Sequence, residues 1–274
     1  MSIISALQEI FSLKFMVYAL ISGTLVSVCA SLLGVTLVLK RYSMIGDGLS
    51  HVAFGSLAVA AAVGAAPMKV AIPVVIAAAF LLLRLSEKGK LKGDALTALI
   101  STGALAVGIM AISLSSGMNI DIYNYMFGSI LAMSAEDVYL SLALAAVVLL
   151  LFVVFYNRIF AITFDESFAR ATGTRVSRYN LLIALLTALT IVIGMRIMGT
   201  MLISGLIIFP ALTAMRVCRS FRGVVLTSAI ISVFSFLAGM VLSYVMRTPA
   251  GASIVAVNAL LFCLFALIGK LAKR

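Results

Sequence analysis

Residues 15–39 read FMVYALISGTLVSVCASLLGVTLVL and contain no charged side chain. A helix needs about 20 predominantly apolar residues to cross a hydrocarbon core of about 30 Å, so this stretch is long enough to span a membrane. Similar charge-free runs cover residues 138–157, 223–246 and 248–269. Together they predict an all-α fold, a polytopic transmembrane helical bundle.

The composition of the whole chain supports this class. Of its 274 residues, 64% are hydrophobic and 11% are charged, whereas a soluble domain averages about 25% charged residues. The net charge of +11 does not indicate nucleic-acid binding, because the basic residues lie in short loops between apolar runs, as membrane anchors do. The three cysteines are far apart in the sequence and form no ligand cluster.

The apolar runs divide the chain, taken as one domain over residues 1–274, into candidate spans. We predict nine, at residues 15–39, 48–66, 70–84, 95–115, 138–157, 179–195, 197–215, 223–246 and 250–269. The third is short and contains Pro73, and the sixth and seventh are separated only by MRIMG at residues 195–199. If either weak pair forms one bent helix, the count is eight.

Lysine and arginine residues cluster in alternate loops. They follow the first, third, fifth and seventh spans and end the chain, and the main ones are Lys40, Arg41, Arg84, Lys88, Lys90, Lys92, Arg158, Arg170, Arg175, Arg178, Arg216, Arg219, Arg222, Lys270, Lys273 and Arg274. Cytoplasmic loops carry such an excess. Nine spans therefore place the N-terminus outside and the C-terminus in the cytoplasm.

The long loop between the fourth and fifth spans contains NIDIYNYMFGSILA at residues 119–132. It begins with the acid Asp121 and continues with Tyr123 and Tyr125, aromatic residues that suit the interface between membrane and water. We predict a short helix or a re-entrant segment on the outer face. The simpler interpretation is an interfacial anchor.

The largest loop on the basic side reads TFDESFARATGTRVSRYN at residues 163–180. Thr163 followed by Glu166 matches a capping box, and Gly173 suits a helix C-terminus. Phe164 and Phe168 are spaced to share one helix face. Three charged residues accompany them: Asp165, Glu166 and Arg170. A helix of two to three turns is marginal alone in water, so we expect it to pack on the membrane surface or the span ends, or to dock a cytosolic partner.

The segment RYSMIGDGLSHVAFG at residues 41–55 places an acid and the chain's one histidine in apolar sequence. A charged residue at the centre of a membrane helix costs about 2.5–3.5 kcal/mol on insertion scales, and such groups usually face the bundle interior or a water-filled path. Asp47 and His51 are four residues apart and share a helix face. Gly46 and Gly48 flank the acid and permit local unwinding.

Three roles are open for this pair. A carboxylate and an imidazole suit a Zn²⁺, Mn²⁺ or Fe²⁺ ion in transit, although two ligands are too few for a tight site and a second copy of the chain would supply two more. In a purely structural role, Asp47 is the N-cap of the second span and pairs with His51. The third role is a proton relay.

Weaker signals lie in the second half of the chain. Met195, Met198 and Met201 are three residues apart, a spacing that suggests a copper path but is far more often packing. Pro210 is expected to kink the seventh span, because it removes a backbone hydrogen bond. The sequence contains neither the HExxH motif of a metalloprotease nor a Walker A motif for ATP hydrolysis.

Four segments together resemble the permease subunits of bacterial zinc, manganese and iron ABC importers. KRYSMIGDGLSHVAFG at residues 40–55 resembles that family's G-D-x-L-S-H stretch, and YNYMFGSILAMS at residues 123–134 resembles its Y-L-F-G-x-I-L segment. TFDESFARATG at residues 163–173 resembles its F-D-x-x-x-A-x-x-x-G loop, and MGTMLISGLIIFPALTA at residues 198–214 resembles its proline-containing span. The segments occur in the family's order.

The resemblance implies a fold like that of the vitamin B12 importer's permease and a homodimer in the bacterial cytoplasmic membrane. Separate cytoplasmic ATPase subunits would dock on residues 163–173, which would form the coupling helix. An extracytoplasmic metal-binding protein would deliver ions near residues 119–132. Asp47 and His51 would be the residues of the metal pathway.

These expectations describe an ATP-driven importer permease with no permanently bound cofactor and no enzymatic activity of its own. Zinc is the first choice, because LSHVAFG resembles zinc permeases and imidazole favours zinc, with manganese or iron as alternatives. Two other classes are open. One is a proton-coupled secondary transporter that uses Asp47 and His51, and the other is a siderophore or cobalamin permease of similar fold.

Overall fold

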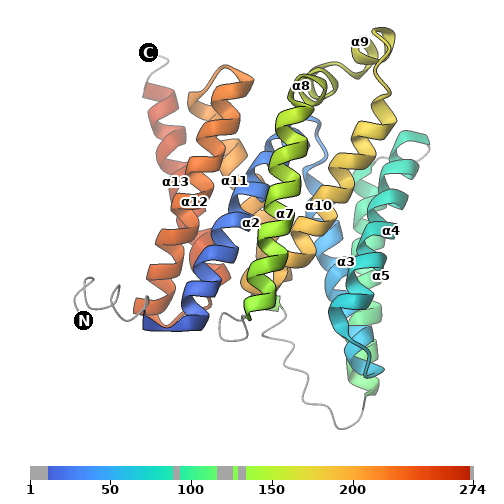
Figure 1. Cartoon of the computed structure of the whole chain (residues 1–274), viewed down its shortest axis with the longest axis vertical. Coiled ribbons are helices and arrows are strands. Elements are labelled where there is room, and N and C mark those ends of the chain that lie inside the picture. The colour runs from blue at the N-terminus through green and yellow to red at the C-terminus, as the bar shows by residue number, and fades with distance from the viewer. Residues whose placement is uncertain (1–11, 89–92, 116–125, 129–133, 272–274) are drawn as a thin grey trace.

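The computed structural model describes residues 12–88, 93–115, 126–128 and 134–271, and this part of the chain folds into helices without a strand (Figure 1). The long helices are α2 (Lys14–Leu39), α3 (Ser43–Ala62), α4 (Pro67–Lys88), α5 (Gly93–Leu114), α7 (Ala135–Val154), α10 (Val176–Met198), α11 (Thr200–Val217), α12 (Phe221–Met246) and α13 (Ala250–Leu271). Two short helices, α8 (Tyr156–Phe164) and α9 (Glu166–Ala171), connect α7 to α10. The predicted all-α bundle is confirmed.

Eight of the long helices in the described ranges are long and apolar enough to cross a membrane. The other, α11, has a shorter apolar stretch, Leu202–Val217. It packs against α2, α12 and α13, and its Ile203 and Leu206 side chains are fully buried. Each of the nine predicted spans is thus a separate helix, and eight of them have the length and composition of a membrane span.

Consecutive long helices run in alternating directions through the bundle (Figure 1). The short helices α8 and α9 lie at the same end of the bundle as the α2–α3 connection and the C-terminal end of α13. Lysine and arginine are concentrated in these connections. We therefore call the end that carries α8 and α9 the basic end, and its charge matches the pattern of a cytoplasmic face.

Two residues with positive φ mark sharp reversals of the chain. Arg41, with φ of 61°, lies between α2 and α3, and Gly199, with φ of 82°, separates α10 from α11. The alternative of one bent helix over the sixth and seventh spans is therefore wrong. A β-carbon at Gly199 would also collide with the backbone of Met126 and Gly128, so this position favours glycine twice, by conformation and by space.

Glycine residues bring α3 and α5 into close contact. A β-carbon at Gly55 would collide with the backbone carbonyl of Ala104, and one at Gly108 would lie 2.7 Å from the Cα atom of Gly55. A β-carbon at Gly48 would meet the side chain of Thr97. Small residues let membrane helices approach closely. Gly48 and Gly55 therefore serve packing, and α3 is continuous where the sequence permitted local unwinding.

Candidate functional site

Asp47 and His51 lie on consecutive turns of α3 and face the same side. The His51 Nε2 atom is 3.7 Å from Asp47 Oδ2, as the spacing of four residues predicts. The helix begins at Ser43, and Tyr42 is its N-cap residue. The interpretation of Asp47 as the N-cap is therefore wrong, because the acid lies a full turn inside the helix.

The pair lies on a partly open face of α3. The side chains of Asp47 and His51 are 37% and 17% exposed, and Met44, one turn earlier, is 44% exposed. On the opposite face, Ile45 and Leu49 are buried in the bundle. The Nδ1 atom of His51 is buried and has no hydrogen-bond partner within the described part of the chain. The chain by itself leaves this polar face of α3 incompletely covered.

The geometry of the pair suits two ligands of one ion. At 3.7 Å, His51 Nε2 and Asp47 Oδ2 are too far apart for a good hydrogen bond. Bonds from zinc to nitrogen or oxygen are about 2.0–2.2 Å long, so two ligand atoms of one ion lie up to about 4 Å apart. Among the residues that the structure describes, no three His, Cys, Asp or Glu side chains gather into a metal site. The described part of one chain thus brings together two candidate ligands, Asp47 and His51.

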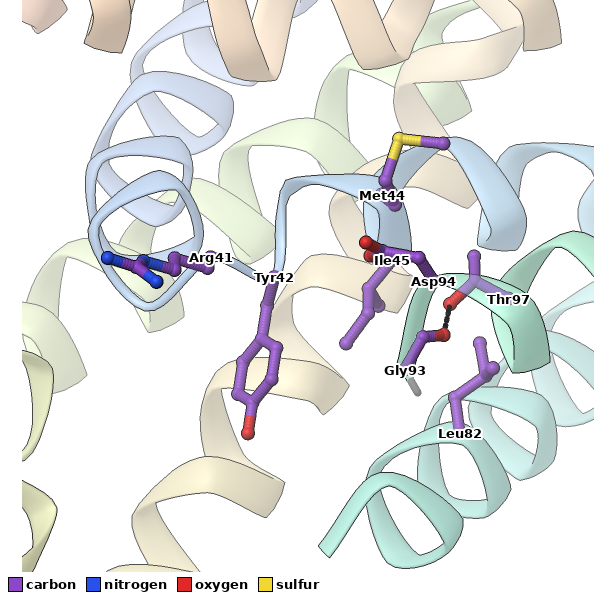
Figure 2. A pocket seen from close by; sticks show the side chains of 8 residues that line it. All are labelled: Arg41, Tyr42, Met44, Ile45, Leu82, Gly93, Asp94 and Thr97. Atoms are coloured by element: carbon purple, nitrogen blue, oxygen red, sulfur yellow. Dashed lines mark hydrogen bonds between the residues drawn. The ribbon is translucent and has the colours of Figure 1, made fainter. Parts of the chain in front are cut away.

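A cavity of about 180 Å³ opens beside the first turn of α3, at the basic end. Figure 2 shows that Asp94 and Thr97 of α5 line it opposite Met44 and Ile45 of α3. Among the described residues that line it, Asp94 is the one acid. It lies in the first turn of α5, where a negative charge suits the helix dipole. Sequence reasoning did not single it out, because an acid at a helix start is common.

The helix predicted at residues 163–173 is divided into two. The first, α8, continues to Phe164, and the second, α9, begins two residues later. Asp165 lies between them as the N-cap of α9, and its carboxylate accepts a hydrogen bond from the Phe168 amide at 2.9 Å. The predicted capping box is therefore wrong, because the Thr163 hydroxyl donates to a backbone carbonyl of α8 instead.

The C-terminus of α9 follows the prediction. Gly173 has a φ of 83°, and its amide donates to the carbonyl of Arg170 at 3.1 Å. The Thr174 amide donates to the carbonyl of Ala169 at 2.9 Å. These two bonds form the Schellman motif, and Arg170 places a cation in the last turn of the helix, where it complements the dipole.

Phe164 and Phe168 do not share a helix face, because the break at Asp165 separates them. The Phe164 ring packs against Phe160 and Phe221, with ring centroids 5.0 and 5.9 Å apart. Its side chain is nevertheless 59% exposed, and that of Phe168 on α9 is 63% exposed. Both residues therefore leave apolar surface open at the basic end.

Glu166 takes part in a polar cluster that sequence reasoning missed. The Lys40 Nζ atom lies 2.5 Å from Glu166 Oε1, 2.5 Å from Asn180 Oδ1 and 3.4 Å from the carbonyl oxygen of Ile162. The Asn180 Nδ2 atom donates to Glu166 Oε1 at 3.3 Å. In the sequence, Lys40 is one of the basic loop residues that indicate the cytoplasmic side. Glu166 is the second residue of a predicted capping box. No local pattern indicates that they meet.

The remaining predicted residues are less well defined by the structure. Asp121, Tyr123 and Tyr125 lie outside the described residues, so their role at the outer mouth stays a prediction. Pro210 lies inside α11 as expected, and its kink stays a prediction as well. Met195 and Met198 are buried in the core, which supports packing as their role.

The model of the ABC 3 transport family matches residues 12–269 of the chain. The manganese transport system membrane protein MntC of Halalkalibacterium halodurans is 28% identical over 94% of this chain and 88% of its own length. The high-affinity zinc uptake system membrane protein ZnuB of Haemophilus influenzae is 29% identical over 90% of this chain and 94% of its own length.

A solved structure has the same architecture. PsaBC from Streptococcus pneumoniae in complex with Fab matches with a TM-score of 0.86 and 28% identity, over 96% of this chain and 95% of that chain. The resemblance inferred from four sequence motifs is thus confirmed across nearly the whole molecule. The chain belongs to the ABC 3 transport family, as a membrane-spanning permease subunit.

Proposed function

We propose that the chain is the permease of an ATP-driven importer that carries a divalent transition-metal ion, with zinc as the first choice, into the bacterial cytoplasm. The observation that carries this proposal is the pair of Asp47 and His51, which face each other at 3.7 Å on a partly open face of a membrane helix. Family membership supports a transport role. The chemistry of the pair supports a metal ion as cargo.

Asp47 and His51 would bind the ion in complementary ways. Asp47 supplies a hard carboxylate oxygen, and His51 supplies the borderline Nε2 nitrogen. For Nε2 to be a ligand, the imidazole must be neutral with its proton on Nδ1. Two ligands bind weakly, and weak binding suits a cargo that must enter and leave.

A second copy of the chain would complete the site. The face that carries Met44, Asp47 and His51 is not fully covered by its own chain. A carboxylate against lipid is costly, so this face needs a partner or a water-filled path. A two-fold axis close to it would bring together two Asp47 and two His51 side chains, which are the four ligands that zinc prefers.

The choice between metals rests on ligand chemistry. Relatives of similar identity are named for manganese and for zinc. Two imidazoles and two carboxylates favour zinc, whereas manganese would add oxygen ligands or water. Iron is the remaining alternative.

Partners would bind at the two ends of the bundle. We expect the basic end to face the cytoplasm, together with the C-terminus, and a separate ATPase subunit to dock there on α9. The exposed rings of Phe164 and Phe168 would contribute apolar contacts to that interface, beside Asp165, Glu166 and Arg170. An extracytoplasmic binding protein would deliver the ion at the other end, near residues 119–132.

The test is the metal content of cells that lack the gene. In zinc- or manganese-limited medium, elemental mass spectrometry should show a loss of one metal, and expression of the wild-type chain should restore it. Unchanged contents of zinc, manganese and iron would contradict the proposal. Uptake that persists after complete removal of ATP would indicate a secondary transporter driven by protons instead.

A further inference from the structure

The cluster around Lys40 joins four separate parts of the molecule. Lys40 ends α2 as its C-cap residue, and its ammonium group contacts Glu166 at the start of α9 and Asn180 near the start of α10. It also donates to the carbonyl of Ile162 in α8. The three protons of the ammonium group thus have three acceptors, one on each of three other helices.

Because the cluster is buried, it favours one relative arrangement of the helices that it joins. The Lys40 side chain is 5% exposed, and Asn180 is also buried. A buried charge needs its partners, so the ammonium group resists separation from Glu166. The Glu166 side chain is 36% exposed, because α9 lies at the surface of the basic end. The cluster therefore extends from an accessible short helix to a buried helix terminus.

Lys40 is also adjacent to the connection that positions the candidate metal ligands. The chain turns tightly after it, with Arg41 in the left-handed region and the Tyr42 amide bonded to the carbonyl of Leu37 at 2.8 Å. The next helix, α3, begins at Ser43 and carries Asp47 one turn later. This turn is short and internally hydrogen-bonded, so a displacement of Lys40 would move the start of α3.

We propose that Lys40, Glu166 and Asn180 are positioning residues that link α9 mechanically to the α2–α3 turn and so to Asp47 and His51. When an ATPase partner moves α9, Glu166 draws Lys40 with it, and the start of α3 follows. The Asn180 side chain accepts a hydrogen bond from Lys40 through Oδ1 and donates one to Glu166 through Nδ2. It thereby connects both residues to α10. This inference rests on the proposed function, because it assigns a role within the same transport cycle.

The experiment compares Lys40→Met, Glu166→Gln and the reversed pair Lys40→Glu with Glu166→Lys in the assembled transporter in lipid vesicles. Metal uptake and ATP hydrolysis are measured separately. Loss of the link should lower the metal carried per ATP hydrolysed by about tenfold in Lys40→Met, while the rate of ATP hydrolysis changes little.

Glu166→Gln keeps a hydrogen bond to Lys40 and should lose less of this coupling. The reversed pair should recover part of the coupling, because the Asn180 amide offers both a donor and an acceptor, while the Ile162 carbonyl loses its donor.

Lys14→Met is the matched control, because Lys14 begins the same helix at the opposite end and is exposed. It should leave both activities unchanged. Wild-type uptake per ATP in Lys40→Met would overturn the inference. A parallel fall of uptake and hydrolysis, with no recovery in the reversed pair, would also overturn it, because a merely structural cluster would behave in this way.

A readout without cargo separates this inference from the proposed function. Hydrogen exchange of the Arg41 and Tyr42 amides should change when ATP is added to the wild-type complex, and should not respond in Lys40→Met. If wild-type vesicles take up no metal but this response is present, the proposed cargo is wrong and the link stands. If metal uptake is normal but the response is the same in both proteins, the link is wrong and the cargo stands.

Discussion

Two polar groups lie near the basic end, seven positions apart in the sequence at Lys40 and Asp47, and they differ in how completely they are satisfied. In the first, the Lys40 ammonium is almost fully buried and has three acceptors at 2.5 to 3.4 Å. In the second, Asp47 and His51 are 3.7 Å apart and partly exposed, and His51 Nδ1 has no partner among the described residues. We call the Lys40 group closed, because its charge has its partners within the chain. We call the Asp47 group open, because it lacks some of these partners.

This difference predicts two different roles: the Lys40 group would transmit motion between helices, and the Asp47 group would bind the cargo. A closed buried network holds its helices in one relative arrangement, because each lost bond leaves a costly unpaired group. An open pair contributes little to the fold and keeps free ligand positions. A transport site needs such positions, since its cargo must bind and then leave. The contrast predicts that changes to the two groups will have different consequences.

The largest effect is expected at the open pair. Asp47→Ala and His51→Ala should each lower metal accumulation by at least about tenfold, as loss of a metal ligand does. Both proteins should still insert in the membrane and bind their ATPase, because the fold does not depend on the pair. Accumulation is measured by elemental mass spectrometry, with Glu136→Gln, an exposed acid at the start of α7, as the control. Normal uptake in either variant would remove the pair from the pathway.

The next effect concerns the position of α3 rather than its ligands. Gly55→Ala should destabilise the folded protein by about 1–3 kcal/mol, because the new methyl group collides with α5. Gly103→Ala on α5 meets open space and should stabilise by up to about 1 kcal/mol through helix propensity. Thermal unfolding in detergent measures both changes. Equal behaviour of the two variants would show that the α3–α5 contact is looser than described.

The third effect separates the two exposed phenylalanines. Phe168→Ala should weaken binding of the ATPase by about tenfold, as loss of an apolar interface anchor does. Phe164→Ala should weaken this binding less and should also lower stability, because part of its ring packs on Phe160 and Phe221. Co-purification and thermal unfolding of both variants distinguish docking from packing. Unchanged assembly in Phe168→Ala would leave α9 without a docking role.

The smallest effect is expected at the cap of α9. Asp165→Ala removes the side-chain hydrogen bond to the Phe168 amide and should cost about 1 kcal/mol locally. Amide exchange within α9 should become several-fold faster, with α10 unaffected as the internal control. Equal protection in variant and wild type would mean that the cluster around Glu166 alone orders the helix.

The sequence was sufficient for features with a local or periodic signal. Charge-free runs predict the spans because a helix must match the thickness of the membrane. The spacing of Asp47 and His51 predicts their shared face, because residues four positions apart are neighbours on the surface of a helix. Gly173 likewise predicts the end of α9, because few other residues adopt its left-handed conformation.

The sequence was insufficient where distant parts of the chain meet or where two local signals compete. Lys40 and Asn180 are 140 positions apart, and nothing near either residue indicates the other. In the loop, Thr163 and Asp165 are both good N-caps, and packing of Phe164 against Phe221 extends α8 past the first of them. The exact residue at which α8 ends and α9 begins thus depends on tertiary contacts.

Anomalous diffraction at the metal edge, from crystals of the assembled transporter soaked in zinc or manganese, would locate the bound ion. With zinc, we expect a metal peak about 2.0–2.2 Å from a carboxylate oxygen of Asp47 and from Nε2 of His51, with a second copy of the chain completing its coordination. A metal peak elsewhere in the membrane, with Asp47 and His51 facing lipid, would show that this pair is not the metal site.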